Sequence, residues 1–441
     1  MATLEQTAPR QFGFDMLAWT IQACMRPLQL LIAAPSVLFI VVMGLMLFHP
    51  PDFRFPSYDR FAFGLLVVIV LLRIALLRKP MWMGGPVTWP MLGLFILGLC
   101  GVLVQPYDAG IWSMFAAKWL VPFTLFLLAG YVFENPSSRR QLEIFSLIVL
   151  AYLSLVSICF LIGAREFIVP RYILNESFGI HADRARGPFL QAVANGLALN
   201  MLGLVALDSF RRRRLRGVLA VFFLAALPLA ILATRTRAVW LSFALSILAL
   251  PLFSRNRRLR RGCLVIGVAS ALGLLAVAVI ADGHRSLSDR LVERSQVDFR
   301  VTVYQAGWEM FLQKPLTGWG ARGMQAELSS RITEFHQDEY YFHNTYLEIV
   351  VQYGLIGLAL YVWVVIDLFR IGRKTACILP QDSGFLDQQF RAVWTVMLMV
   401  YVTNSLFVVL NYQFINAFLF TLAGALASQN RRRLGEPNVA L

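Results

Sequence analysis

The sequence has few charged residues for its length, and that shortage excludes an ordinary soluble protein. Of its 441 residues only 15% are Asp, Glu, Lys or Arg, whereas 58% are hydrophobic. Soluble domains carry about 25% charged residues to cover their surface. The mean hydropathy is +0.64, and the composition therefore predicts a polytopic integral membrane protein.

Cysteine and acidic residues are also scarce. The 5 cysteines lack the CxxC spacing of paired metal ligands, which excludes the common zinc motifs and predicts no disulfide. With 25 acidic against 40 basic residues the net charge is +15, a value that in a soluble protein suggests nucleic-acid binding. Here the basic residues lie in short tracts between apolar runs, as topology signals do, so we expect no nucleic-acid partner.

Long apolar runs, in contrast, are abundant. A helix needs about 17–25 apolar residues to cross a bilayer core, and the sequence contains about twelve such runs. They lie at 28–48, 61–77, 87–104, 113–133, 142–163, 188–209, 217–234, 236–253, 262–281, 345–368, 392–410 and 413–429. We expect an all-α protein of about twelve transmembrane helices, with a long periplasmic loop between the ninth and the tenth.

The basic tracts fall on one side of the membrane if these helices alternate in direction. Tracts at 211–216, 255–261 and 431–433 define that side as cytoplasmic by the positive-inside rule. The first apolar run has no small-residue cleavage site after it and is expected to be a retained anchor. The predicted divisions are a cytoplasmic segment 1–27, transmembrane helices at 28–281, a periplasmic catalytic loop at 282–344, transmembrane helices at 345–429 and a cytoplasmic tail at 430–441.

Several arginines then fall on the outer face, where short loops normally carry few basic residues. Arg235 and Arg237 lie in a tight turn between two apolar runs, and Arg186 and Arg300 lie in outer loops. Arginine is suited to bidentate contact with phosphate, so these residues predict a clamp for a lipid-linked diphosphate. The alternative is interfacial snorkelling or pairing with acidic residues. The acidic candidates are Glu293, Asp298, Glu334, Asp338 and Glu339.

His343 lies where the long outer loop meets an apolar run. Asn344 is a good N-cap for the helix that follows, and the positive end of that helix disfavours a protonated imidazole. These features predict a neutral catalytic base at a membrane surface, and the alternative is a histidine that only ends the loop. Earlier in the loop, apolar residues recur at helical spacing over 297–313, and Gly318 and Gly320 indicate an irregular turn.

Four blocks of residues resemble, in order and spacing, the bacterial O-antigen ligase and O-antigen polymerase superfamily of polytopic membrane glycan transferases. The blocks are Arg186 to Phe189 with Asn195 to Ala198, Thr236 to Trp240, Arg300 to Gly320, and His343 to Glu348 with Gly354 and Gly357. The chain departs from the family pattern at two places. Thr236-Arg237-Ala238 replaces the usual Ser-Arg-Gly, and Gln352 replaces an acidic residue, which argues against a role for an acid at position 352.

The resemblance implies an inverting glycosyltransferase that needs neither a metal nor another cofactor. Such proteins lie in the bacterial inner membrane and move a glycan from an undecaprenyl-diphosphate carrier to an acceptor hydroxyl at the periplasmic face. In the family, the histidine matching His343 is the proposed base, and the arginines matching Arg186, Arg237 and Arg300 hold the diphosphate. Arg235 is added to the predicted diphosphate ligands because it lies in the same turn as Arg237. The residues expected to support the site are Asn344, Tyr346, Glu348, Gly318 and Gly320.

The sequence does not distinguish between the two main acceptors. Lipid A-core as acceptor makes an O-antigen ligase, and a lipid-linked repeat makes an O-antigen or exopolysaccharide polymerase. A protein O-oligosaccharyltransferase ranks lower, because nothing here resembles the larger C-terminal part common in those enzymes.

Two other functional classes are alternatives. A lipid-linked oligosaccharide transporter would bind its cargo near mid-membrane, where the main charges are Arg73 and Lys118. For Lys118 we expect interhelical pairing or snorkelling instead. A metal-dependent hydrolase is disfavoured, because this sequence lacks the HExxH motif of such enzymes. Its candidate ligands are His336, Asp338, Glu339 and His343.

Overall fold

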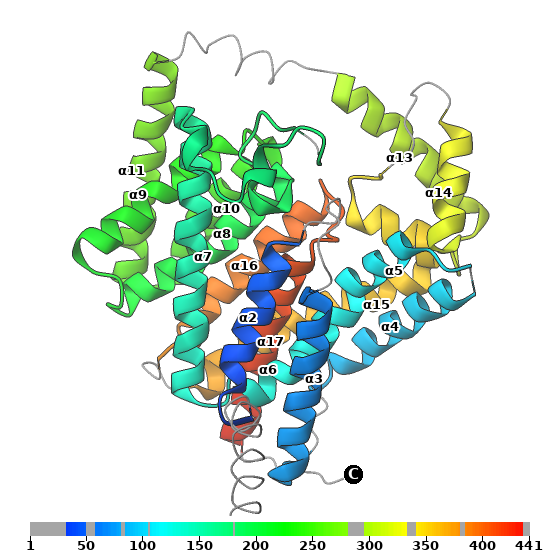
Figure 1. Ribbon diagram of the computed structural model, residues 1–441, viewed down its shortest axis with the longest axis horizontal. Coiled ribbons are helices and arrows are strands. Elements are labelled where there is room, and N and C mark those ends of the chain that lie inside the picture. Colours follow the sequence, from blue (N-terminus) through cyan, green and yellow to red (C-terminus); the bar gives the residue numbers. More distant parts are fainter. Residues whose placement is uncertain are drawn as a thin grey trace, which may run out of the picture.

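In the computed structural model the chain is a bundle of helices joined by irregular segments (Figure 1). The structure describes residues 32–49, 58–80, 84–104, 106–179, 181–280, 295–332, 341–379 and 384–434, and no strand occurs among them. This confirms the all-α prediction. The α-helices are α2 (Pro35–Leu47), α3 (Tyr58–Leu76), α4 (Thr88–Leu103), α5 (Ala109–Phe115), α6 (Val121–Val132), α7 (Pro136–Ile162), α8 (Ala192–Arg211), α9 (Gly217–Ala233), α10 (Arg237–Phe253), α11 (Arg257–Ile280), α13 (Ser295–Gln313), α14 (Gly320–Arg331), α15 (Thr345–Ile378), α16 (Phe390–Ser405) and α17 (Gln413–Leu434).

Every apolar run predicted as a span overlaps at least one of these helices. Within the described residues, 4 helices are long and apolar enough to cross a membrane. These are Ala109–Val132, Pro136–Ile162, Ala192–Arg211 and Thr345–Ile378. Shorter apolar helices such as α2, with 13 residues, reach only about 20 Å at 1.5 Å per residue. The membrane character of the chain is therefore supported, while the number of about twelve spans stays a prediction.

A short π-helix, η1 (Ala116–Leu120), joins α5 to α6 within one of the predicted spans. A π-turn shifts the register of the side chains that follow it, and such turns are frequent at functional sites. The carbonyl of Ala117 accepts a hydrogen bond from the Asn416 side chain of α17 at 3.1 Å. This contact fixes η1 against α17 and orients Lys118, which lies at the middle of the turn.

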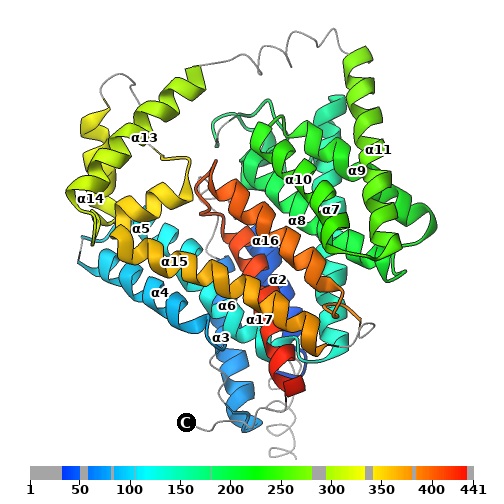
Figure 2. The ribbon, with the colours of Figure 1, turned by 180° about the vertical axis from the view of Figure 1, so that it is seen from behind.

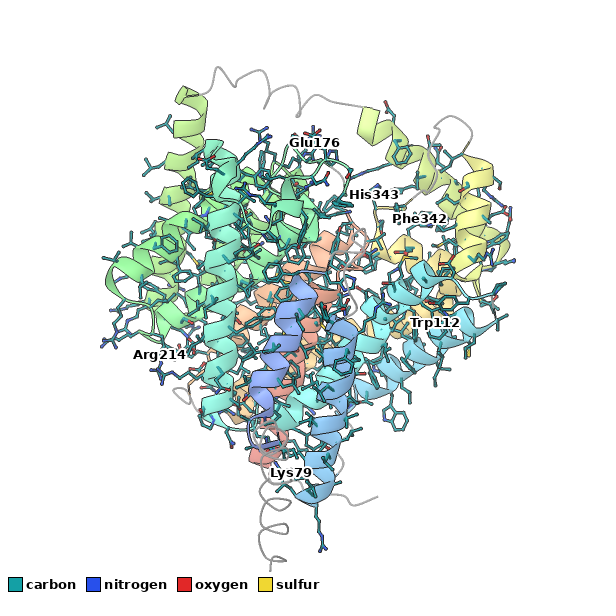
Figure 3. All side chains as sticks on the ribbon, in the orientation of Figure 1. Lys79, Trp112, Glu176, Arg214, Phe342 and His343 are labelled. Atoms are coloured by element: carbon teal, nitrogen blue, oxygen red, sulfur yellow. The ribbon has the colours of Figure 1, made fainter. Side chains whose placement is uncertain are left out.

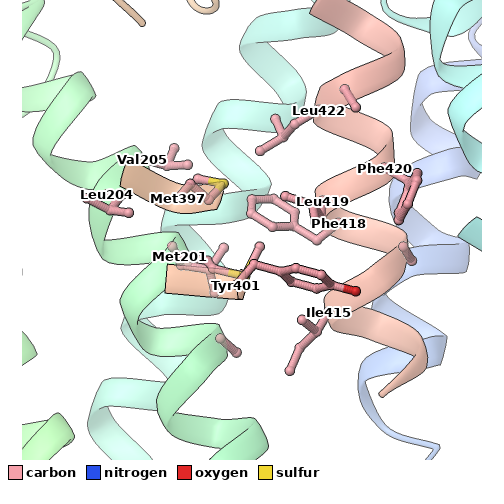
Figure 4. Packing of buried hydrophobic residues seen from close by; sticks show 14 of the residues in the cluster. Met201, Leu204, Val205, Met397, Tyr401, Ile415, Phe418, Leu419, Phe420 and Leu422 are labelled. Carbon is pink, nitrogen blue, oxygen red and sulfur yellow. The ribbon is translucent and has the colours of Figure 1, made fainter. Parts of the chain in front are cut away.

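The core lies where α8, α16 and α17 meet (Figure 4). Of the most apolar window of α8, 89% is buried inside the protein, so this helix is surrounded by others and not by lipid. Met201 of α8, Met397 of α16 and Phe418 of α17 belong to one cluster of buried side chains. We expect this cluster to set the relative positions of the helices around it, because packed interiors resist deformation.

The helices around this core form two groups (Figures 1 and 2). Helices α7, α8, α9, α10 and α11 contact one another on one side, and α4, α5, α13, α14 and α15 contact one another on the other. The predicted amphipathic helix in the outer loop is confirmed as α13. Its residues Val303, Ala306 and Met310 are buried in a second hydrophobic cluster with α14 and α15.

The end of the bundle predicted to face the cytoplasm carries a buried network of ion pairs. Arg211 contacts Asp208 and Asp387 at 2.8 and 2.7 Å, and Arg212 contacts Glu143 and Asp208 at 2.7 Å. These arginines therefore have carboxylate partners supplied by the fold itself. They provide a contrast with the arginines at the opposite end of the bundle.

Candidate functional site

His343 is held between two firmly placed neighbours. Phe342 before it is 1% exposed and packs in the cluster of α13 and α14. Asn344 after it caps α15, since its side-chain oxygen accepts hydrogen bonds from the main-chain amides of Tyr346 and Leu347 at 3.0 and 3.1 Å. The predicted N-cap is thus confirmed. Between these anchors His343 has φ of 50°, a left-handed conformation that is uncommon for a residue with a side chain and that clusters at functional sites.

The imidazole of His343 is in an environment that keeps it neutral. Burial, together with the positive charge of Arg300 on α13, lowers the pKa of His343 from its ordinary 6.5 to about 4. The hydroxyl of Tyr304, one turn further along α13, lies 3.5 Å from the main-chain oxygen of His343. An unprotonated imidazole at neutral pH can accept a proton, which is the requirement for a general base.

Arg235 and Arg237 lie at the turn between α9 and α10. The side chains of Thr234 and Trp240 hold the turn, because both donate to the carbonyl of Ile231, at 2.7 and 3.1 Å. Both arginines are exposed. Within the part of the chain that the structure describes, no side-chain hydrogen bond or ion pair is found for either guanidinium. Of the acids proposed as partners, Asp298 lies in α13, whereas positions 293, 334, 338 and 339 lie outside the described residues.

Arg186 is placed differently from the other predicted diphosphate ligands. It is 0% exposed, and its guanidinium donates to the carbonyls of Ile173, Asn175 and Phe178. In this conformation Arg186 shapes the loop that precedes α8. A direct contact with a diphosphate would require some of these carbonyls to be released, a feature that sequence reasoning did not anticipate.

The loop that contains Arg186 adjoins the arginine turn. The amide of Ala185 donates to the carbonyl of Ala233 at the end of α9, at 3.1 Å. Asn195 of α8 donates to the carbonyl of Ala185 at 2.9 Å and to the hydroxyl of Ser157 of α7 at 3.0 Å. The structure therefore brings Arg186, Arg235 and Arg237 to one region, at the ends of α8, α9 and α10.

Residues 406–412, between α16 and α17, connect this region to His343. The Thr345 hydroxyl, at the start of α15, donates to the Val408 carbonyl at 2.7 Å and accepts from the Leu410 amide at 3.0 Å. At the other end of the segment, the Tyr412 hydroxyl donates to the Gln191 side chain, directly before α8. Figure 3 shows His343 toward the loop that carries Glu176, with Phe342 on the side of α13 and α14.

The glycines expected to support the site pack against a kink in α15. Gly318 and Gly354 have φ of 69° and 67°. A Cβ on Gly318 would lie 2.5 Å from the Gln352 main chain, and one on Gly354 would lie 2.1 Å from the Leu316 carbonyl oxygen. The amides of Trp319 and Leu355 donate to the carbonyls of Val351 and Pro315. Gly320, with φ of 70°, begins α14 directly after this turn. The turn therefore fixes the outer segment to α15.

Two further predicted residues lie on the first turn of α15. The hydroxyl of Tyr346 donates to the carbonyl of Val402 at 3.2 Å, which fixes this turn to α16. Glu348 pairs with Lys118 of η1, with 2.6 Å between Nζ and Oε1. The pairing expected for Lys118 is thus confirmed. Its partner was not identified from the sequence, although a glutamate one turn inside an apolar run was a signal for it.

Of the candidate metal ligands, positions 336, 338 and 339 lie outside the described residues. Elsewhere in the described ranges, no three His, Cys, Asp or Glu side chains lie close enough together to hold a metal ion.

A family model described as O-Antigen ligase matches residues 219–362. The matched region runs from α9 into α15 and contains Arg235, Arg237, Arg300 and His343. It confirms the resemblance to this superfamily and contains three of the four sequence blocks, whereas the first block, at 186–198, lies before the matched region. No curated protein matches the chain.

Proposed function

We propose that this chain, in which residues 219–362 match the O-Antigen ligase family model and four helices are apolar and long enough to cross a membrane, moves a glycan from an undecaprenyl-diphosphate carrier to an acceptor hydroxyl at the periplasmic face of the inner membrane. The observation that supports this best is the environment of His343. A histidine in a left-handed backbone conformation, with a pKa of about 4 beside Arg300, is a neutral base held in one position.

In the proposed reaction the acceptor oxygen attacks the anomeric carbon of the donor glycan. The bond between that carbon and the diphosphate oxygen breaks, and its electron pair stays on the diphosphate. The acceptor proton passes to the imidazole of His343, which acts as a general base. A single in-line displacement inverts the anomeric configuration, and all atoms are supplied by the donor, the acceptor and the imidazole.

The exposed arginines are proposed to receive the diphosphate. Arg235 and Arg237 project from the turn before α10 with no carboxylate partner in the described residues. Planar guanidinium groups can make two parallel hydrogen bonds to phosphate oxygens and stabilise the charge that builds on the leaving group. Arg186 is proposed to position this turn through its loop, and Arg300 to bind the diphosphate from the side of His343.

Donor binding is also expected to change the pKa of His343. In the protein without donor, Arg300 and burial hold the pKa of His343 at about 4. The negative charge of a bound diphosphate favours the protonated imidazole and so raises this pKa. Proton uptake by His343 is therefore expected to become more favourable once the donor is in place.

The acceptor is proposed to be lipid A-core, as for an O-antigen ligase, with polymerisation onto a lipid-linked repeat as the alternative. Purified protein in lipid nanodiscs would be given a lipid-diphosphate oligosaccharide together with both acceptors. Mass spectrometry of the products would identify the acceptor used. The proposal is wrong if neither acceptor is glycosylated and the protein instead moves the intact donor across liposomes.

A further inference from the structure

We propose that the C-terminal part of α13 and the turn after it enter the outer leaflet of the membrane and bind lipid there. The contact surface consists of the side chains of Trp308, Leu312 and Leu316, which we call the outer stripe. This inference goes beyond the proposed function, because it concerns how the outer segment is held at the membrane and requires no particular donor or acceptor.

The first observation is that α13 is apolar on two opposite faces. One face is buried in the cluster that it forms with α14 and α15. On the opposite face Trp308 and Leu312, one turn apart, are 55% and 60% exposed, and Leu316 in the turn that follows is 62% exposed. A helix face in contact with water normally carries polar residues. Large apolar side chains that gather at a surface instead mark a contact with a partner or a membrane.

The second observation identifies the membrane as that contact. Helix α15 is long and apolar enough to span a bilayer, and 50% of its most apolar window is buried inside the protein. The rest of this window therefore faces lipid. Over residues 355–366, after the kink at Gly354, every exposed side chain of α15 is apolar, and this surface begins at Leu355 and Ile356.

The outer stripe continues this lipid-facing surface without a break. The Leu355 amide donates to the Pro315 carbonyl at 2.8 Å. A Cβ on Gly354 would lie 2.1 Å from the Leu316 carbonyl oxygen, so the two main chains are in direct contact. Figure 2 shows α13 and α14 beside the end of α15 where this contact is made. Because the turn is fixed to the kink, Leu316 and Leu312 extend the apolar surface that begins at Leu355.

The residues beside the outer stripe suit the headgroup region of a bilayer. The Lys314 Nζ lies 3.9 Å from the centre of the Trp319 ring, and within the described part of the chain it pairs with no carboxylate. The rings of Trp308 and Phe311 pack against each other at 5.2 Å. Tryptophan and lysine are typical of membrane interfaces, because their apolar parts enter the hydrocarbon while their polar ends reach the headgroups. A lipid phosphate is the expected partner of the Lys314 ammonium.

This contact would fix the height of the catalytic segment above the membrane. Phe342, directly before His343, is buried in the same cluster as the inner face of α13. Packed clusters of this kind transmit position because they resist deformation. Lipid bound to the outer stripe therefore holds α13, and through Phe342 it holds His343 at a defined depth.

The test measures the depth of the outer stripe. In a protein whose five cysteines are replaced by alanine, Leu312→Cys and Leu316→Cys would each carry a nitrobenzoxadiazole label in nanodiscs that hold one copy. Ile356→Cys on α15 is the lipid-facing reference, and Ser329→Cys, exposed on α14 of the same outer segment, is the matched control. A doxyl group on the lipid acyl chain should quench the labels at 312 and 316 to within about a factor of two of the label at 356, because all three would lie in hydrocarbon. The label at 329 should stay unquenched.

A second measurement uses a native side chain and guards against a perturbing label. Brominated lipid should quench the tryptophan fluorescence of the unmodified protein more than that of Trp308→Phe, and this difference should disappear in lipid without bromine. The inference is wrong if the labels at 312 and 316 behave like the label at 329, or if Trp308 contributes nothing to the quenching. It is also wrong if a lipid-diphosphate glycan, and not lipid, shields the label at 312 from water. Glycan transfer by the unmodified protein is a separate measurement, so none of these results affects the proposed function.

Discussion

Removing one member of the Lys118–Glu348 pair should destabilise the protein strongly. The two side chains are 10% and 6% exposed, with 2.6 Å between the charged atoms. At an effective dielectric constant of about 20, their attraction is about 6 kcal/mol before desolvation is subtracted. Lys118→Met leaves the Glu348 carboxylate buried without a counter-charge. We expect it to lower the free energy of unfolding by about 3–5 kcal/mol.

Glu348→Gln should cost a similar amount, because it leaves the Lys118 ammonium unpaired. The double variant Lys118→Met/Glu348→Gln contains no buried charge, so its cost should be smaller than the sum of the two single costs by about 1–3 kcal/mol. Equilibrium unfolding in mixed micelles with increasing dodecyl sulfate, followed by tryptophan fluorescence, would measure all three values. Single costs below about 1 kcal/mol, or strict additivity, would refute the claim that the pair is buried and mutually dependent.

Three other variants test the donor site, the base and the scaffold. Arg237→Ala should weaken binding of a lipid-diphosphate glycan by about 2–5 kcal/mol in calorimetry. Arg237→Lys should retain only part of the binding free energy, because an ammonium group cannot make the two parallel hydrogen bonds of a planar guanidinium. Unchanged affinity in Arg237→Ala would exclude the clamp. Burial is the larger cause of the lowered pKa of His343, and the charge of Arg300 is the second. Arg300→Met removes only the second cause, so the pH below which kcat/KM falls should move upward from about 4 and stay below 6.5. A fixed profile would show that Arg300 does not act on the base. Gly354→Ala would place a Cβ 2.1 Å from a carbonyl oxygen at a residue with φ of 67°. It should lower the free energy of unfolding by about 2 kcal/mol or more. The control is Gly64→Ala, whose added Cβ meets nothing within 4 Å and should not lower the stability.

Local features were predictable from the sequence because their causes are local. Asn344 caps α15 through amides two and three residues further on, and the periodicity over 297–313 identified α13. The apolar runs identified the helices for the same reason, because a segment that is buried has a hydrophobic composition of its own. The family resemblance was likewise predictable from short blocks whose residues lie close together in the chain.

Features that depend on distant contacts were not predictable. Lys118 and Glu348 are separated by 230 positions, and nothing near either residue identifies the other. Arg186 was expected to face a ligand, but its guanidinium is occupied by three carbonyls from residues 173–178, a fold of the loop that no periodicity reveals. Gly318 was assigned to a turn, yet its requirement for glycine comes from close contact with Gln352 across the kink of α15.

The central claim is that His343 is the base that activates the acceptor hydroxyl. The most direct test is the variant His343→Asn, because asparagine tolerates the left-handed backbone at φ of 50° but cannot accept the proton. In single-turnover transfer from a lipid-diphosphate oligosaccharide, this variant should be about 10²–10⁴-fold slower than the unmodified protein, with the same donor affinity. His181→Asn, an exposed histidine in the loop before α8 that also has a positive φ of 54°, is the control and should transfer normally. A His343→Asn protein that binds the donor and transfers the glycan at the normal rate would contradict the account.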